Sequence, residues 1–203
     1  MLDGVFRGDS YIIIKNFSLI IFKLIFRLKI IGSENIPETG PFVIVANHSS
    51  LLDGFVLASF VRPKITFMSA AYLFKMPFVG NVLRGVGAIP VQGKGSDIKL
   101  IKEAIKVLQA GGVLGIFPEG RITNEKDDFS AKAGAAYLAI KADVPIIPMA
   151  IKGSNKVLPL GAKFPKLNKI EVKIGKPISC SREIKLNKKI LEDTVNSYMK
   201  EIH

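Results

Sequence analysis

The stretch VIVANHSSLLDG, Val43 to Gly54, contains the end of one predicted element and the start of the next. The continuous apolar run Phe42–Ala46 is typical of a strand buried on both faces of a sheet. It stops at Asn-His, and a polar turn then leads into a short helix predicted for Asp53–Phe60, capped by Ser50 or Asp53. A buried strand followed at once by a helix is the repeating unit of a parallel sheet, so this stretch predicts an α/β fold.

The rest of the chain repeats this alternation of strands and helices. Strands are expected at 28–31, 65–68, 89–91, 113–117, 145–151 and 169–174. Helices are expected at 96–110, 131–142 and 183–201, with helical pieces broken by turns over 72–86. No internal repeat and no linker of domain-boundary length occurs. Residues 1–203 are therefore predicted to form one domain, whose α/β core (28–203) has a mostly parallel central sheet flanked by helices.

The composition indicates that the protein surface binds anionic partners. Of the 203 residues, 48% are hydrophobic, mean hydropathy is +0.32, and 29 Lys and Arg against 17 Asp and Glu give a formal net charge of +12. Nucleic acid, anionic lipid and phosphorylated ligands all fit. No RNA-recognition or helix-turn-helix signature appears, so we expect membrane and phosphate as partners and no nucleic acid.

The single cysteine, Cys180, excludes an internal disulfide and fits a reducing compartment. With two histidines and one cysteine, no His/Cys zinc site is expected. Asp3 and Asp9 stand where a secretory signal carries a basic head, so no cleavable signal is expected.

Residues 11–27, YIIIKNFSLIIFKLIFR, form the most apolar segment. As a helix they would extend roughly 25 Å, short of the roughly 30 Å of a bilayer core. Asn16, Lys23 and Arg27 share one stripe of this helix, and the remaining surface is mostly Ile, Leu and Phe. We expect an amphipathic helix in the membrane interface, with its cations towards the head groups. The alternatives are a core helix whose charges reach solvent and, less favoured, a spanning helix.

The chemistry is expected at strand ends, where two polar loops follow apolar runs. His48 stands five residues before Asp53 in the first loop. One interpretation is a histidine that satisfies a backbone carbonyl at a strand end. The other is a general base, His48, oriented by Asp53. No G-x-S-x-G elbow supplies a protein nucleophile, so such a base would deprotonate a hydroxyl of the substrate.

The second loop, Phe117-Pro-Glu-Gly-Arg121, pairs a carboxylate with a guanidinium beside a glycine. Arg121 can hold a phosphate bidentately, or the loop can be a surface turn with an ordinary ion pair. The stretch Gly87–Ser96 imitates a Walker phosphate loop, but five residues separate its glycines and Gly95 follows Lys94. We reject that motif.

These residues resemble the 1-acyl-sn-glycerol-3-phosphate acyltransferases, a family of glycerolipid acyltransferases. The family's N-H-x-S-x-x-D block is met by Asn47, His48, Ser50 and Asp53, and its F-P-E-G block by Phe117 to Gly120. Its V-P-x-x-P block is met by Val144, Pro145 and Pro148. The order and spacing agree, and the similarity runs from about residue 10 to residue 180.

The resemblance implies an O-acyltransferase in which His48 and Asp53 are the catalytic pair. It implies transfer from acyl-CoA or acyl-carrier protein to a lysophospholipid hydroxyl, without a covalent acyl-enzyme, metal or bound cofactor. It also implies a peripheral or monotopic protein on the cytoplasmic face of the cell membrane. Candidate substrate-binding residues are Asn47, Ser50, Glu119, Gly120, Arg121, Lys94 and Arg84.

The sequence departs from the family where basic groups for the acceptor phosphate are usual. Ala70, Gly93 and Ile122 stand at three expected cationic positions, and Lys94 and Arg121 lie one residue away. Lysophosphatidic acid is the expected acceptor, and another lysolipid, such as lysophosphatidylethanolamine or a lyso-aminolipid, is the alternative. A catalytically inactive lipid-binding module of the same fold is the alternative outside enzymes, and a basic nucleic-acid binder ranks below it.

Overall fold

The computed structural model describes residues 9–77, 79–91, 98–122, 133–181 and 186–202. They contain one seven-stranded sheet whose spatial order is β1-β7-β6-β2-β5-β3-β4. The strands are β1 (Lys29–Ile31), β2 (Phe42–Ala46), β3 (Ile65–Ala70), β4 (Ile89–Val91), β5 (Val113–Ile116), β6 (Ile146–Lys152) and β7 (Glu171–Ile174). Every neighbouring pair is parallel except β6 with β7, so the predicted mostly parallel sheet is confirmed.

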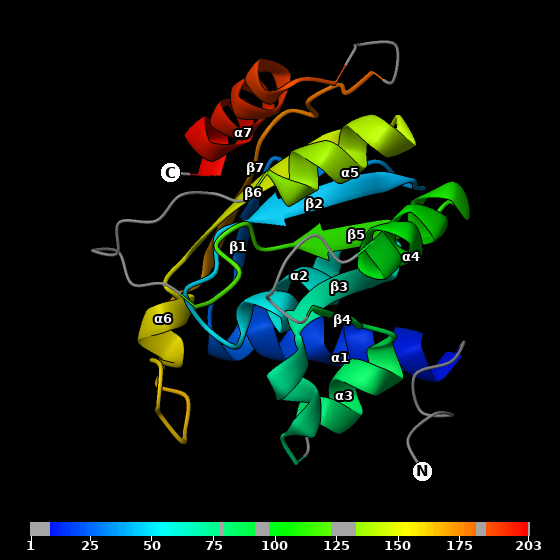
Figure 1. The fold of residues 1–203 in the computed structure, drawn as a ribbon. Helices are drawn as coiled ribbons and strands as arrows, with labels where there is room; N and C mark the ends of the chain where they lie inside the picture. The colour runs from blue at the N-terminus through cyan, green and yellow to red at the C-terminus, as the bar shows by residue number, and fades with distance from the viewer. Residues whose placement is uncertain (1–8, 78, 92–97, 123–132, 182–185, 203) are drawn as a thin grey trace.

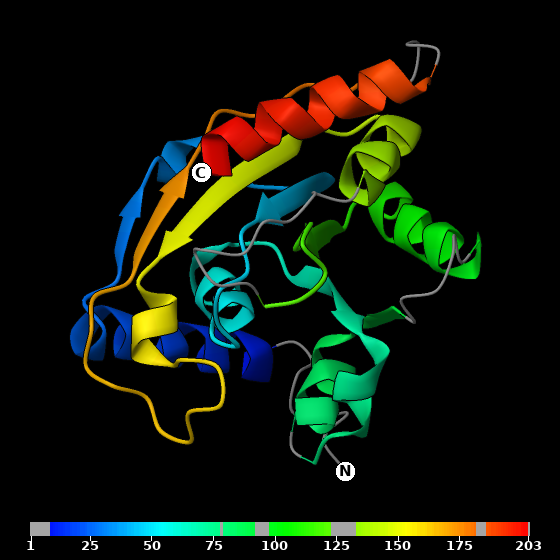
Figure 2. The same ribbon diagram turned by 60° about the vertical axis from the view of Figure 1, so that its left-hand side comes forward.

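Helices cover both faces of the sheet (Figure 1). One face carries α1 (Asp9–Ile25), α2 (Asp53–Phe60) and α6 (Ser154–Val157), which share a core with the strands. The other carries α4 (Ile98–Gln109), α5 (Gly134–Ala142) and α7 (Lys188–Ile202). Figure 2 shows these two helical layers on opposite sides of the strands. The short helices η1 (Ser33–Asn35), η2 (Ala71–Lys75) and α3 (Val79–Val86) complete the described elements.

Strand β2 is central because it is apolar on both faces. All five of its residues are fully buried. Its odd and even side chains enter different cores, Phe42 on the α1 and α2 side and Val43 on the α4 and α5 side. It pairs in parallel with β5 on one edge and β6 on the other. Their carboxyl ends therefore meet where the His48 turn begins.

The predicted elements are found with small shifts in their ends. Strand β2 and helix α2 have the predicted bounds, and 72–86 is indeed broken into η2 and α3. Helix α7 begins at Lys188 rather than residue 183, while 182–185 lie outside the described residues. The predicted helix cap was wrong: the N-cap of α2 is Leu52, and the Asp53 carboxylate turns back to bond the preceding turn.

Helix α1 spans Asp9–Ile25 rather than residues 11–27, and it packs on α2. Arg27, at φ +46°, lies outside the helix, so its place on one helical stripe with Asn16 and Lys23 was predicted wrongly. Phe22 on its inner side and Phe26 just after its end are at most 8% exposed. Lys15 also points inward, and its Nζ donates to the carbonyl oxygens of Val61 and Arg62. Burial, with a contribution from the Arg62 charge, lowers the pKa of Lys15. No helix among the described residues has the length and apolar character needed to cross a bilayer.

The outer side of α1 is apolar and exposed. A helix that served only to cover the core would not need apolar residues on that side. Its exposed apolar residues are Ile12, Ile13, Phe17, Ile20, Leu24 and Ile25. An apolar strip of this kind on a monomer marks a contact surface.

Cys180 provides a test of the α5 and α7 side of the core, against which its side chain packs. Burial, with a smaller contribution from Asp143, raises the pKa of the thiol to about 11. Because only the thiolate reacts, we expect the folded protein to react with Ellman's reagent at mildly alkaline pH about a hundredfold more slowly than the urea-unfolded protein. Equal rates in the two states would show that this packing is absent.

Candidate active site

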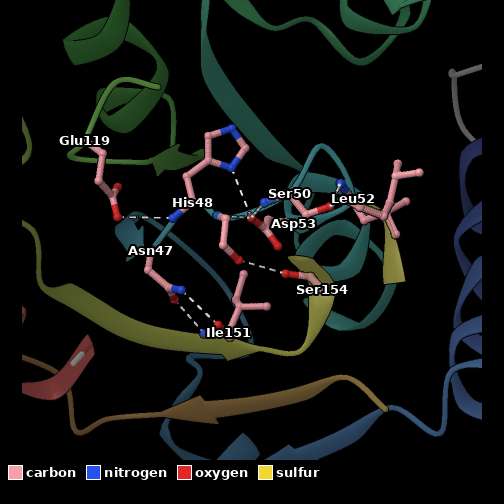
Figure 3. A network of polar contacts seen from close by, with 10 residues as sticks. Asn47, His48, Ser50, Leu52, Asp53, Glu119, Ile151 and Ser154 are labelled. Atoms are coloured by element: carbon pink, nitrogen blue, oxygen red, sulfur yellow. Dashed lines mark hydrogen bonds and ion pairs between the residues drawn. The ribbon is translucent and has the colours of Figure 1, made fainter. Parts of the chain in front are cut away.

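The Asp53 carboxylate organises the turn between β2 and α2. Its side chain is fully buried. Oδ2 accepts hydrogen bonds from the backbone N–H groups of Ser49 and Ser50, both at 2.8 Å, and lies 3.1 Å from His48 Nδ1 (Figure 3). One buried oxygen therefore fixes the backbone of the turn and the imidazole that the turn carries.

The contact with Asp53 selects the tautomer of His48. Because Oδ2 accepts from two backbone N–H groups, Nδ1 carries the proton and donates to it. The remaining nitrogen, Nε2, is then the basic one. Figure 3 shows it on the ring edge turned away from Asp53. The His48 side chain keeps 17% of its surface exposed, so it is not sealed from solvent.

An aromatic stack holds the plane of the imidazole. The rings of His48 and Phe117 lie 4.1 Å apart between centroids at 17°, and Phe117 stacks in turn on Phe67 at 6.0 Å. Gly115 lies opposite Phe67 in the β3–β5 ladder, and a Cβ there would come within 2.6 Å of the Phe67 ring. The absence of a side chain at Gly115 therefore makes room for the stack.

The Phe117–Gly120 turn brings a second buried carboxylate to His48. Gly120 has φ +67°, in the left-handed region that favours glycine, and its N–H donates to Phe117 O at 3.0 Å. Glu119 is 7% exposed, and its Oε1 accepts the backbone N–H of His48 at 3.1 Å. Burial, together with the Glu119 charge, raises the pKa of Tyr198 on α7 to about 12.

Asn47 and Ser50 attach the turn to β6 and to the segment after it. The Asn47 amide donates to Ile151 O at 2.8 Å and accepts from Ile151 N–H at 2.6 Å, so it imitates one more strand residue. Ser50 Oγ donates to Leu158 O at 2.9 Å. Ser49 and Ser154 share a hydrogen bond between their hydroxyl groups at 3.1 Å. These hydroxyl and amide groups bond within the protein, and substrate binding by Asn47 and Ser50 stays a prediction.

The predicted cationic residues are spread over several elements. Arg84 in α3 donates to Phe74 O and to Asn81 Oδ1, both at 2.8 Å. Arg121 lies at the exposed end of the Glu119 turn. Lys94 lies outside the described residues. Hydrogen bonds therefore bring His48, Asp53 and Glu119 together, while the phosphate-binding roles of these cations stay predictions.

The contacts that hold His48 and Asp53 in place were not predicted from the sequence. Phe117 was recognised only as part of a motif, and Phe67, Ser154 and Ile151 carried no signal at all. Among the described residues, no group of three or more His, Cys, Asp or Glu side chains is arranged to hold a metal ion.

Comparison with known proteins identifies the family. The sequence profile described as Acyltransferase matches residues 27–152, which contain both polar loops. The chain belongs to the acyltransferase family. The 1-acyl-sn-glycerol-3-phosphate acyltransferase of Bacillus subtilis (strain 168) is 32% identical over 152 residues, which are 74% of this chain and 73% of that protein.

Other acyltransferases match over more of the chain. The chloroplastic 1-acyl-sn-glycerol-3-phosphate acyltransferase of Arabidopsis thaliana is 28% identical over 90% of this chain, which spans only 52% of that relative. The crystal structure of the 1-acyl-sn-glycerophosphate (LPA) acyltransferase from Thermotoga maritima superposes with a TM-score of 0.75 and 28% identity, covering 95% of this chain and 79% of that one. These relatives assign the chain to the O-acyltransferases of the 1-acyl-sn-glycerol-3-phosphate acyltransferase type.

Replacing Asp53 tests whether its oxygen organises the site. Asp53→Asn keeps the size of the side chain but removes the charge that three N–H groups share. We expect acyl transfer to fall about a thousandfold or more, and the free energy of unfolding to fall by about 1–3 kcal/mol. Turnover and urea unfolding measure the two effects. Asp193→Asn, on the exposed surface of α7, is the matched control. Turnover within about tenfold of wild type would contradict this role.

Gly115→Ala tests the aromatic stack by adding a methyl group next to Phe67. The new methyl group forces the Phe67 ring to move, which we expect to destabilise the fold by about 1–3 kcal/mol and to lower turnover through Phe117. The double variant Gly115→Ala, Phe67→Leu relieves the contact with the Phe67 ring but keeps the 2.8 Å approach to the Ile65 methyl group, so it should recover part of the stability. An unchanged melting temperature in the single variant would show that the close approach does not constrain Phe67.

Proposed function

We propose that this protein acylates the sn-2 hydroxyl of lysophosphatidic acid to give phosphatidic acid, with acyl-CoA or acyl-carrier protein as donor. The observation that carries the proposal is the 3.1 Å contact between His48 Nδ1 and the buried Asp53, which leaves Nε2 as the basic nitrogen. A lipid-binding module without activity does not require this pairing. The family and the named activities of the relatives supply the reaction class.

The proposed reaction is a direct transfer. His48 Nε2 accepts the hydroxyl proton of the acceptor as its oxygen attacks the thioester carbon. The new C–O bond forms and the C–S bond breaks. The departing thiolate takes the proton back from the imidazolium, which restores neutral His48. Asp53 stabilises the imidazolium in between and keeps its ring in place. The two substrates supply every atom that is transferred, so the proposal needs no metal and no bound cofactor.

We propose that the protein works as a peripheral or monotopic enzyme at the cytoplasmic face of the membrane. Both the acceptor and the product are membrane lipids. The exposed apolar strip of α1 and the net charge of +12 support an interfacial position. The acceptor reaches His48 without leaving the lipid surface if α1 lies in that surface.

Another lysolipid is the second candidate acceptor, because Ala70, Gly93 and Ile122 replace expected cations. A side-by-side comparison of acceptors at equal concentration separates the two. We expect lysophosphatidic acid to give the highest rate. A higher rate with lysophosphatidylethanolamine or a lyso-aminolipid would mean that this lipid is the preferred acceptor. The proposed reaction type would stay the same.

Thiol release by the purified protein tests the reaction. With palmitoyl- or oleoyl-CoA we expect release that depends on lysophosphatidic acid and falls about a hundred- to ten-thousand-fold in His48→Ala. The raised pKa of Cys180 keeps the background from protein thiol low. Equal activity in His48→Ala would contradict the mechanism. No release with CoA or carrier-protein donors and any lysolipid would favour the inactive lipid-binding module.

A further inference from the structure

The loop that joins α6 to β7 (residues 158–170, hereafter the α6–β7 loop) exposes three large apolar side chains. Leu160, Phe164 and Leu167 are 67%, 79% and 83% exposed. Among the large apolar residues that the structure describes, Phe164 and Leu167 are the two most exposed. Isolated apolar residues at a surface are ordinary, but three within eight positions of one loop indicate a contact surface.

Backbone hydrogen bonds close this loop, while its apolar side chains remain exposed. Lys166 N–H donates to Val157 O at 2.7 Å, so the loop returns to the end of α6. Within it, Ala162 N–H donates to Pro159 O at 3.0 Å, and Gly161 adopts φ +84°. The exposed side chains therefore belong to a folded loop that does not bury them in the core.

The charge of the loop identifies the partner. Residues 158–170 contain Lys163, Lys166 and Lys169 and no Asp or Glu. Lys169 pairs with Glu171 at 3.2 Å, while Lys163 and Lys166 flank Phe164 on the exposed surface. Apolar side chains interleaved with lysines fit the interface of an anionic bilayer, where the former enter the acyl boundary and the latter meet phosphate groups.

The position of the loop agrees with such a partner. In both Figure 1 and Figure 2 the chain after α6 extends below it on the α1 side of the sheet, whereas α5 and α7 lie on the other side. The exposed apolar strip of α1 is thus on the same side of the molecule. Resting on the proposed membrane-bound function, we propose that the α6–β7 loop is a second membrane contact that inserts Leu160, Phe164 and Leu167 into an anionic lipid interface.

This second contact is connected to the catalytic turn. Ser50 Oγ donates to Leu158 O, the first carbonyl of the loop, at 2.9 Å. Ser49 bonds Ser154 at the start of α6. Ser49 and Ser50, the two residues that follow His48, are thus joined to α6 and to the loop proposed to meet lipid. Two contacts, α1 and the loop, also fix the orientation of the site relative to the bilayer, which one helix alone leaves free to rotate.

A single fluorophore tests the insertion directly, because the chain contains no tryptophan. Phe164→Trp places one in the loop, and Asn196→Trp places one on α7 as the control. On mixing with phosphatidylglycerol–phosphatidylcholine vesicles we expect a blue shift and quenching by brominated lipid for Phe164→Trp only. Unshifted emission while the protein sediments with vesicles would overturn the inference but not the proposed function. A blue shift that depends on protein concentration without vesicles would overturn it in favour of self-association.

Polar substitution tests what the insertion does. The triple variant Leu160→Ser, Phe164→Ser, Leu167→Ser changes only exposed side chains and should weaken partition onto these vesicles about tenfold or more. Turnover with a short-chain acceptor dissolved as monomers should be unchanged, whereas turnover on vesicles should fall. Ile98→Ser on α4, 67% exposed as Leu160 is, controls for loss of an exposed apolar residue. Wild-type vesicle binding by the triple variant would refute the second contact.

Charge reversal tests the anionic preference. Lys163→Glu with Lys166→Glu should weaken partition onto phosphatidylglycerol vesicles by about fivefold for each lysine. Lys141→Glu with Lys189→Glu, on α5 and α7, changes the net charge equally on the opposite side and should have a smaller effect. Equal losses in the two double variants would show that only the total charge matters and would overturn the role of the loop lysines.

Discussion

The structure of the site depends on one buried oxygen, Asp53 Oδ2. Its three partners are the N–H groups of Ser49 and Ser50 and the imidazole of His48. A buried carboxylate without such donors would be costly, so the turn and the histidine are constrained to one arrangement. The same constraint supports the proposed chemistry, since a histidine that donates from Nδ1 keeps Nε2 as the accepting nitrogen.

The sheet positions the other groups of the site around this oxygen. Because β2 lies between β5 and β6 and all three are parallel, their carboxyl ends meet at one edge. The β5 end supplies Phe117 and Glu119, and the β6 end supplies the Ile151 backbone that holds Asn47. Helix α6 and the loop after it then connect this edge to an exposed apolar, basic surface. The proposed membrane contact and the proposed base are thus parts of one connected structure.

Much of this arrangement was predictable from sequence, for identifiable reasons. The uninterrupted apolar run predicted β2, and the spacing between His48 and Asp53 fitted a strand end followed by a helix start. The sequence placed the His48 and Glu119 loops at strand ends, but their adjacency depends on the strand order, which was not predicted. The Asn47–Ile151 clamp joins residues 104 positions apart, and no local pattern encodes it. The four-residue helix α6 is too short for periodicity to reveal.

In the proposed mechanism, Asp53 holds His48 as the Nδ1–H tautomer, with Nε2 as the base. Nitrogen-15 NMR of the imidazole measures this directly, and the chain's only other histidine, His203, can be removed by His203→Ala. At a pH where His48 is neutral, we expect a protonated Nδ1 and an unprotonated Nε2, with the preference lost in Asp53→Asn. A proton on Nε2 in the wild-type protein, or the same tautomer balance in both proteins, would contradict it.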